Sequence, residues 1–410
     1  MTPLAITHYT LTSALGVGLE SHLQHLQQGK SGLTPCDFAG AETLGTWVGE
    51  VDGLPDVTLP ESLSIFDCRN NRLAWLGLQA DGFREAVAEA AQRYGAGRVA
   101  VFIGTSTSGI QQTELVYREL GLTPDREDMP RLPDWYHYEG SHNTYSVAEF
   151  VRRALALRGI SSAISTACSS SAKVFASAHR AMAAGLCDAA VVGGVDSLCL
   201  TTLHGFQSLQ LVATDVCRPS DAERQGLSIG EAAGFALLQH AEAVVQPGHE
   251  NAPPAMQLLG YGESSDAHHM SSPHPEGAGA YAAMHQAMQR ANLSKGDIDY
   301  INLHGTGTRT NDLVESLAVQ RLFSQAPPCS STKGFTGHTL GAAGIVEAVI
   351  AMLALAQGFM PESLNTRRLD PDIDINILLQ PESGNLRRIL SNSFGFGGSN
   401  CSLVLAAAAS

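Results

Sequence analysis

Several kinds of motif are missing from this sequence. Its eight cysteines include no C-x-x-C pair, so neither a zinc ribbon nor a thioredoxin-like redox site is expected. Positive charge is scarce, with 25 Lys and Arg against 40 Asp and Glu and a net charge of −15, which disfavours nucleic acid as a partner. We therefore expect neither a metal centre nor a nucleic-acid interface.

A secretory leader and long apolar runs are missing as well. The first ten residues, MTPLAITHYT, have neither the basic start nor the apolar core of a signal peptide. The longest apolar helix candidate, residues 345–360, contains Glu347 and is too short to span a bilayer. We expect a cytoplasmic protein with reduced thiols and no membrane span.

Buried strands alternate with helices along the chain. Residues 98–104 and 188–195 are apolar runs with glycine, typical of buried strands that lead into turns. Between them, residues 170–185 place apolar side chains at the helical period. Strand, helix and strand in this order predict an α/β fold.

A linker divides the chain into two halves. Residues 245–254 contain three prolines and a glycine between apolar segments. The expected halves are therefore residues 1–246 and 255–410. The second half repeats the alternation of strand and helix seen in the first, which makes an internal duplication plausible.

The segment STACSSS at 165–171 contains a candidate nucleophile. An apolar strand candidate runs into it and a helix runs out, which places Cys168 at a helix N-terminus. Unpaired amides and the positive end of the helix dipole favour a thiolate at this position. Most free cysteines are buried and inert, but the turn from strand to helix favours a reactive role here.

Two histidines follow in the second half. His304 opens HGTGT directly after a strand candidate, although a satisfied core histidine would fit the same pattern. His338 stands in KGFTGHTLGAAG, at 333–344, just ahead of a helix whose N-terminus favours a neutral imidazole. A fourth segment, SNSFGFGGSN at 391–400, is glycine-rich but precedes a strand, so a dinucleotide-binding loop is excluded.

Taken together, these motifs resemble those of the condensing enzymes, which are the elongating β-ketoacyl-acyl-carrier-protein synthases and the polyketide ketosynthases. The matching segments are TACSSS at 166–171, HGTGT at 304–308, K-x-x-TGH-x-x-GAAG at 333–344 and NSFGFGG at 392–398. The resemblance continues in CRPSDAER at 217–224 and GEAAG at 230–234. It implies the thiolase fold, in which two similar βαβαβαββ halves stack as five α-β-α-β-α layers.

The resemblance also implies a reaction. Cys168 would accept an acyl chain from acyl carrier protein as a thioester. His304 and His338 would then bind malonyl-acyl-carrier-protein and stabilise the enolate left by decarboxylation. The amides of Cys168 and Phe396 would form the oxyanion hole, and Phe396 would also gate the acyl pocket.

Further supporting roles follow from the same family pattern. Lys333 would tune the histidines while pairing with Glu315, and Asp312 would support the site. No dissociable cofactor and no metal would be needed, because the phosphopantetheine arm comes with the carrier protein. The carrier would dock on Arg69 and Arg72, although two solvated surface arginines would look the same in the sequence.

The family's active unit is two-fold symmetric, so we expect a homodimer or a heterodimer with a chain-length-factor homologue. The three serines after Cys168, together with segments 104–109, 206–211 and 217–220, are similar to ketosynthases of the polyketide and aryl-polyene type. Two alternatives stay open. One is a non-catalytic chain-length partner, and the other is a thiolase-type coenzyme A enzyme in which Cys401 would be a second catalytic cysteine.

Overall fold

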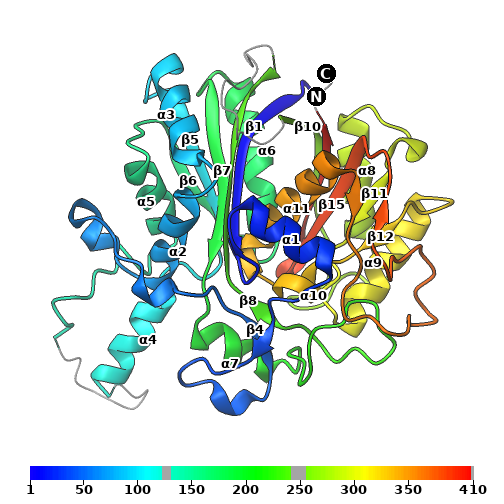
Figure 1. Ribbon diagram of the computed structural model, residues 1–410, viewed down its shortest axis with the longest axis horizontal. Helices are drawn as coiled ribbons and strands as arrows, with labels where there is room; N and C mark the ends of the chain where they lie inside the picture. Colours follow the sequence, from blue (N-terminus) through cyan, green and yellow to red (C-terminus); the bar gives the residue numbers. More distant parts are fainter. Residues whose placement is uncertain (122–130, 242–254, 408–410) are drawn as a thin grey trace.

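The computed structural model describes residues 1–121, 131–241 and 255–407, and it shows a mixed α/β protein (Figure 1). Its main feature is an eleven-stranded sheet. The strands of the two halves of the chain meet in this sheet where β1 (Leu4–Ser13) pairs with β10 (Met256–Ser265). The linker expected at 245–254, and the boundary between the halves with it, lie outside the described residues, so that division stays a prediction.

The first half contributes five main strands in the spatial order β6-β5-β7-β9-β1. Strand β5 is parallel to β6 and β7, whereas β9 is antiparallel to both β7 and β1. These strands are β1 (Leu4–Ser13), β5 (Val99–Gly104), β6 (Ser161–Ile164), β7 (Ala189–Asp196) and β9 (Ala232–His240).

The second half repeats this arrangement strand by strand. Its order is β12-β11-β15-β16-β10, with β11 parallel to β12 and β15, and β16 antiparallel to β15 and β10. The strands are β10 (Met256–Ser265), β11 (Tyr300–Asn302), β12 (Cys329–Ser330), β15 (Arg388–Gly395) and β16 (Ser399–Ala407). When the five strands of each half are numbered in sequence order, both halves place them side by side in the order third, second, fourth, fifth, first. The duplication suggested by the sequence is therefore present in the topology.

Helices pack on both faces of these strands in three layers. The outer layer of the first half contains α2 (Arg69–Leu78), α3 (Phe83–Tyr94) and α5 (Ser146–Ala154), and the outer layer of the second contains α8 (Ala278–Arg290) and α9 (Arg309–Leu322). Between the two sets of strands lie α6 (Ser170–Ala183) and α11 (Ala343–Gln357), which pack against each other (Figure 1). This is the five-layered thiolase fold that the sequence predicted.

The central helix α11 is apolar on all sides. By length and composition Leu340–Gln357 could cross a membrane, but 89% of this stretch is buried inside the protein. A helix that is hydrophobic all round needs apolar surroundings, and here both sets of strands supply them. Both α6 and α11 pack between the two sets of strands, so the positions of their N-termini are fixed. Reactive side chains at these N-termini can therefore be placed accurately.

The remaining elements are shorter and lie around this frame. Strands β4 (Trp47–Gly49) and β8 (Ile229–Gly230) form a small sheet with β3 (Thr34–Pro35), close to the N-terminal end of α11. The shorter elements are α1 (Leu19–Gln28), α4 (Ile110–Glu119), α7 (Leu200–Ser208), α10 (Lys333–Thr336), β2 (Gly16–Val17), β3 (Thr34–Pro35), β4 (Trp47–Gly49), β8 (Ile229–Gly230), β13 (Phe359–Met360) and β14 (Glu382–Ser383).

Candidate active site

Cys168 lies in the tight turn between β6 and α6, as the sequence predicted. The preceding residue, Ala167, has a φ of 52°, in the left-handed region that non-glycine residues rarely adopt. The turn is held by Ser170, whose hydroxyl accepts a hydrogen bond of 2.9 Å from the Thr166 amide. Strained backbone of this kind collects at functional sites, and here it directs the cysteine side chain toward the second half.

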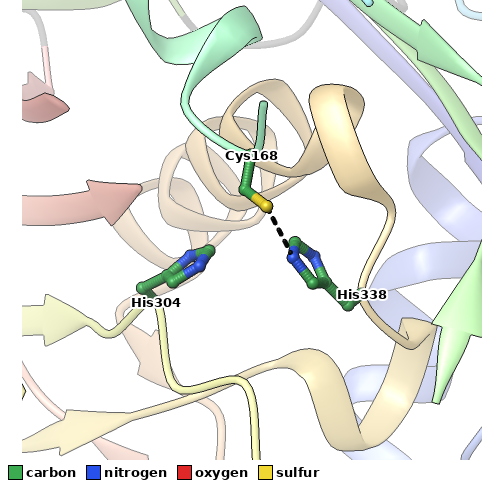
Figure 2. Close-up of side chains that lie close together, drawn as sticks. All are labelled: Cys168, His304 and His338. Atoms are coloured by element: carbon green, nitrogen blue, oxygen red, sulfur yellow. Dashed lines mark hydrogen bonds between the residues drawn. The ribbon is translucent and has the colours of Figure 1, made fainter. Parts of the chain in front are cut away.

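His338 reaches the same point from the N-terminal end of α11. Its amide donates to the carbonyl of Ser228 at 2.7 Å, and its carbonyl accepts from Gly230 at 3.0 Å, so the small sheet fixes its backbone. Gly337 has a φ of 71° and a side chain there would press on the same sheet, which explains the glycine. The ring places Nε2 at 3.0 Å from the Cys168 sulfur (Figure 2).

His304 follows β11 and completes the group. Its amide and that of Gly305 donate to the Glu315 carboxylate at 2.9 and 2.8 Å, which closes the turn after the strand. The His304 and His338 rings lie 5.3 Å apart, nearly perpendicular, on two sides of the sulfur (Figure 2). The reactive atoms of Cys168, His304 and His338 all lie within 4.8 Å of one another.

Both imidazoles are neutral in this site. Burial lowers the pKa of His304 well below its usual value, and the Lys333 ammonium and His338 lower it further. Burial and Lys333 have the same effect on the pKa of His338. Because Lys333 Nζ lies 3.3 Å from His304 Nδ1 and an ammonium can only donate, Nδ1 is the acceptor. His304 therefore carries its proton on Nε2, the nitrogen available to donate in the site.

The Cys168 thiol does not match the expectation of a ready thiolate. Burial raises its pKa to about 11, although Lys333 and the Phe396 amide act in the opposite direction. The cost of burying a charge outweighs the helix N-terminus, so the resting group is a thiol. Its proton can pass to His338 Nε2 at the 3.0 Å contact when an acyl group arrives.

Lys333 pairs with Glu347 and not with Glu315, which corrects the sequence-based expectation. The ammonium is 2% exposed and contacts the Glu347 carboxylate and the His304 carbonyl. Glu347 lies on α11, where Ser393 also donates to it at 3.1 Å. Burial raises the pKa of Glu347 to about 7, with Lys333 acting in the opposite direction. A lone acid in an otherwise apolar helix was the signal that could have identified this partner.

Asp312 supports the site from beneath the HGTGT turn. Its carboxylate accepts from the Ser220 amide at 2.9 Å and from Gly307 at 3.2 Å, and it lies 3.4 Å from Arg224. Burial raises the pKa of Asp312, and Arg224 opposes this shift. The segment CRPSDAER is thereby tied to HGTGT, which connects two motifs that are distant in the sequence.

Asp196, at the end of β7, is a residue that the sequence analysis missed. It accepts from the amides of Ser106 and Thr107 at 2.9 Å and also from the Gly341 amide. Since Gly341 lies just after His338, this acid holds the second half's catalytic loop against the first half. Its position as the last residue of a buried strand was the available signal.

Phe396 follows β15 and lies beside the nucleophile. Its amide donates toward the Cys168 sulfur, on the side where an oxyanion hole would be needed. Its ring stacks on Phe206 of α7 with 5.5 Å between centroids. A side chain at Gly395 would come within 3.2 Å of the Cys168 amide, so glycine is needed for this close approach. The proposed gate and oxyanion roles of Phe396 stay predictions.

A pocket of about 260 Å³ leads from the surface to these residues. Cys168, His304 and His338 line its base. The other lining residues include Phe206, Gln210, Leu211, Gln225, Leu227, Thr306, Thr308, Arg309, Phe394, Phe396 and Asn400. Cys168 is the one cysteine among the residues that line this pocket. By ligand type the two histidines and the cysteine would also suit a transition metal, so the expected absence of a metal stays a prediction.

Arg69 is unsuitable for docking a carrier. Its guanidinium is only 11% exposed and binds Glu231 at 2.6 Å and Glu50 at 2.7 Å. The Glu231 side chain is fully buried, so Arg69 neutralises an internal charge. Arg72 is 32% exposed and paired with Asp67 at 2.6 Å, and its docking role stays a prediction.

Comparison with known proteins agrees with this geometry. The family described as "Beta-ketoacyl synthase, N-terminal domain" matches residues 1–243, and "Beta-ketoacyl synthase, C-terminal domain" matches residues 256–367. The chain is similar to the 3-oxoacyl-[acyl-carrier-protein] synthase 2 of Vibrio harveyi, at 32% identity over 98% of this chain and 97% of that one. It is 40% identical to the enzyme of the same name from Rhizobium meliloti over 263 residues, 61% of each chain.

A solved structure shows the same likeness in three dimensions. It is described as a ketosynthase (ApeO) in complex with its chain length factor (ApeC) from Xenorhabdus doucetiae. This chain matches it with a TM-score of 0.87 and 37% identity, covering 99% of this chain and 98% of that one.

Proposed function

From the premise that this chain belongs to the β-ketoacyl synthase family and is a condensing enzyme, we propose that it extends an acyl group held on Cys168 with a malonyl thioester on acyl carrier protein. The observation that carries this proposal is the meeting of one thiol and two neutral imidazoles within 4.8 Å at the base of a pocket. Fatty-acid, polyketide and aryl-polyene elongation all use this chemistry.

The first step transfers the acyl group to the protein. The Cys168 sulfur attacks the acyl thioester carbonyl while its proton passes to His338 Nε2, which lies 3.0 Å away. The carbonyl oxygen becomes an oxyanion, and the amides of Cys168 and Phe396 would donate to it. The carrier thiolate then leaves and takes the proton from His338, so both groups return to the neutral state.

The second step forms the new carbon–carbon bond. The malonyl thioester loses CO₂, and the electron pair of the broken bond forms an enolate. His304 donates to the enolate oxygen from Nε2–H. Once Cys168 is acylated it has no thiol proton to give, so His338 can take the tautomer that carries its proton on Nε2 and donate as well. The enolate carbon attacks the acyl thioester on Cys168, and the bond from carbonyl carbon to sulfur breaks. The sulfur leaves as a thiolate and takes up one proton from solvent, the proton that the overall reaction consumes. Neutral imidazoles suit this role because they donate without protonating the carbon that must react.

We also propose a partner chain. The relative from Xenorhabdus is described with a chain length factor, and this chain has a surface that suits such an assembly. Strand β6 is the edge of the sheet and leads directly to Cys168. Exposed apolar residues gather on α4 and on the segment 131–145 that is hydrogen-bonded to it: Leu115, Tyr117, Leu132, Trp135, Tyr138 and Tyr145. An unpaired sheet edge and an exposed apolar patch are both typical of protein–protein contacts.

Two other functions are less well supported by the site. A non-catalytic chain-length partner would not need a thiol and two imidazoles in contact. A thiolase-type enzyme would need a second cysteine in the pocket, but Cys401 is fully buried in β16, where burial raises the pKa of its thiol. No dissociable cofactor enters the proposed steps, and a cytoplasmic location fits a partnership with carrier proteins.

Intact-mass analysis tests the proposed function. The protein is incubated with a panel of acyl-carrier thioesters and then with malonyl-carrier, while the carrier-bound product is identified. We expect one acyl adduct on Cys168 that disappears as a β-ketoacyl product forms. An adduct on another residue, or turnover without an adduct, would contradict the proposal. Sedimentation of the active enzyme at the mass of a single chain would contradict the dimer.

A further inference from the structure

The wall of the catalytic pocket runs from buried to exposed along a single stretch of chain. His304 is 1% exposed and Thr306 is 6% exposed, whereas Arg309, at the start of α9, is an exposed residue. All three line the same pocket. Five extended residues cover at most about 17 Å, so the distance from the catalytic histidine to Arg309 is bounded by that length. This stretch therefore marks the route from solvent to the nucleophile.

Arg309 is a cation at the outer end of this route, where its charge helps to lower the pKa of the Asp370 carboxyl. Within the described residues its side chain forms no hydrogen bond and no salt bridge. Neighbouring Arg224 differs, because it is buried and binds Asp370 at 2.6 Å, the Asp221 carbonyl at 2.8 Å and the Arg309 carbonyl at 3.0 Å. One arginine therefore holds the fold, whereas the other has no direct hydrogen bond or salt bridge among the described residues and can turn to a ligand.

The net charge of the protein is unfavourable to the approach of anions. The chain has a net charge of −15, so a negatively charged arm that approaches the pocket meets long-range repulsion. A local guanidinium at the rim offsets this repulsion where it matters, and its planar fork can bind two phosphate oxygens at once. An unpaired arginine at this place is therefore most useful to a substrate that carries a phosphate.

We propose that Arg309 binds the phosphate of the phosphopantetheine arm and thereby positions the thioester over Cys168. The proposal rests on the proposed function, which requires substrates delivered on such an arm. The arm is long and flexible, and fixing its outer end reduces the freedom that must be lost before reaction. Arg309 is in this sense a positioning residue that does not touch the reacting atoms.

Three thioesters with the same acyl group separate the possible roles. Acyl-pantetheine has no phosphate, acyl-phosphopantetheine has the phosphate alone, and the acyl-carrier has both phosphate and protein. We compare kcat/KM for wild type, Arg309→Gln and Arg93→Gln. Arg93 is a matched control, because it is exposed on α3, it does not line the pocket and its replacement changes the charge equally.

The expected result is a change in preference. In Arg309→Gln the ratio of kcat/KM on acyl-phosphopantetheine to that on acyl-pantetheine should fall about tenfold, the usual size for a lost charge-assisted hydrogen bond. The ratio should be unchanged in Arg93→Gln. An unchanged ratio in Arg309→Gln would overturn the proposal, as would a loss confined to the carrier-bound substrate, which would indicate contact with the carrier protein. Failure of the proposed function would appear differently, as absent turnover of all three substrates by wild type.

Discussion

The two halves of the molecule share one topology but contribute different chemistry. In each half an inner helix follows the third strand in sequence: α6 follows β6 directly, and α11 follows β12 after the short helix α10. A reactive residue stands just before each inner helix, Cys168 in the first half and His338 in the second. The turns after the second strands differ more. After β5, the hydroxyls and amides of residues 105–107 bind Asp196, whereas after β11 the turn carries His304.

This difference separates two tasks. The first half holds a nucleophile and uses its other turn for structure. The second half fixes its turn by backbone bonds to Glu315, which leaves the His304 ring free to face the substrate. Duplication thus provides two inner helix N-termini that meet at one point, and local substitutions decide which of them attacks and which donates hydrogen bonds.

Loss of the first half's reactive group should have the largest effect. Cys168→Ala should reduce condensation by about 10³-fold or more, since no other thiol lines the pocket. The melting temperature should change little, because one small buried side chain replaces another. Product formation and thermal unfolding are measured together. A folded variant that still makes β-ketoacyl product would break the assignment of nucleophile to this half.

Loss of the second half's imidazoles should separate the two steps. His304→Ala should slow malonyl decarboxylation by about 10²- to 10³-fold, the usual size for a lost donor to an oxyanion. It should leave acylation of Cys168 less affected. His338→Ala should slow both steps, because His338 contacts the sulfur at 3.0 Å. CO₂ release and intact mass measure the steps separately, and the opposite pattern would exchange the two roles.

The buried ion pair of Lys333 and Glu347, next to His304, can be disrupted by replacing one partner. Glu347→Gln should destabilise the protein by about 3–5 kcal/mol, because it leaves the Lys333 ammonium buried without its counter-charge. Urea unfolding measures this loss. Glu276→Gln, at an exposed acid, is the control. A loss below about 1 kcal/mol would show that Lys333 finds another partner or loses its proton.

The carboxylate that fixes the His304 turn should make stability depend on pH. Burial raises the pKa of Glu315 to about 7 from an ordinary value of 4.5, so between these values the folded protein binds more protons than the unfolded chain. The contribution of Glu315 to stability is therefore largest at low pH and falls as pH rises toward 7.

Glu315→Gln tests this dependence. The free energy of unfolding is compared at pH 5.5 and 7.5 in wild type and in the variant. The decrease on going to pH 7.5 should be smaller in the variant by about 2 kcal/mol, given about 1.4 kcal/mol per pKa unit. Equal decreases in both proteins would mean that this carboxyl titrates as it does in the unfolded chain.

The smallest effect is expected at the aromatic pair beside the pocket. Phe206→Ala removes the ring on which Phe396 stacks, and such pairs contribute about 0.5–1.5 kcal/mol beyond buried area. Acylation of Cys168 should change by no more than about tenfold. Rates measured with short and long acyl groups would show whether the change depends on chain length, as expected for a gate. A total loss of acylation would mean that Phe206 has a further role.

Much of this arrangement could be predicted from the sequence. The alternation of strands and helices indicated an α/β protein with two similar halves, and the turn before residues 170–185 placed Cys168 at a helix start. The approach of His304 and His338 to this cysteine followed from the family resemblance. For Cys168 the local pattern was sufficient, because the change from a strand pattern to a helix pattern places it at the helix N-terminus.

Other features depended on contacts that the sequence does not display. Lys333 was expected to pair with Glu315, but it pairs with Glu347, which lies on the buried central helix α11. Arg69 looked like a surface cation, although Glu231, far along the chain, binds it internally. The Cys168 thiolate was expected from the helix N-terminus alone, and burial proved the stronger effect on its pKa. In each case tertiary packing decided between options that look alike in the sequence.

The division of labour between the halves is tested most directly by CO₂ release from malonyl-carrier in the Cys168→Ala variant. If the second half alone activates malonyl, the variant should continue to release CO₂ at a rate within about tenfold of wild type, although it forms no acyl adduct and no condensation product. Loss of CO₂ release together with acylation would contradict this account, because it would show that decarboxylation needs the sulfur of the first half.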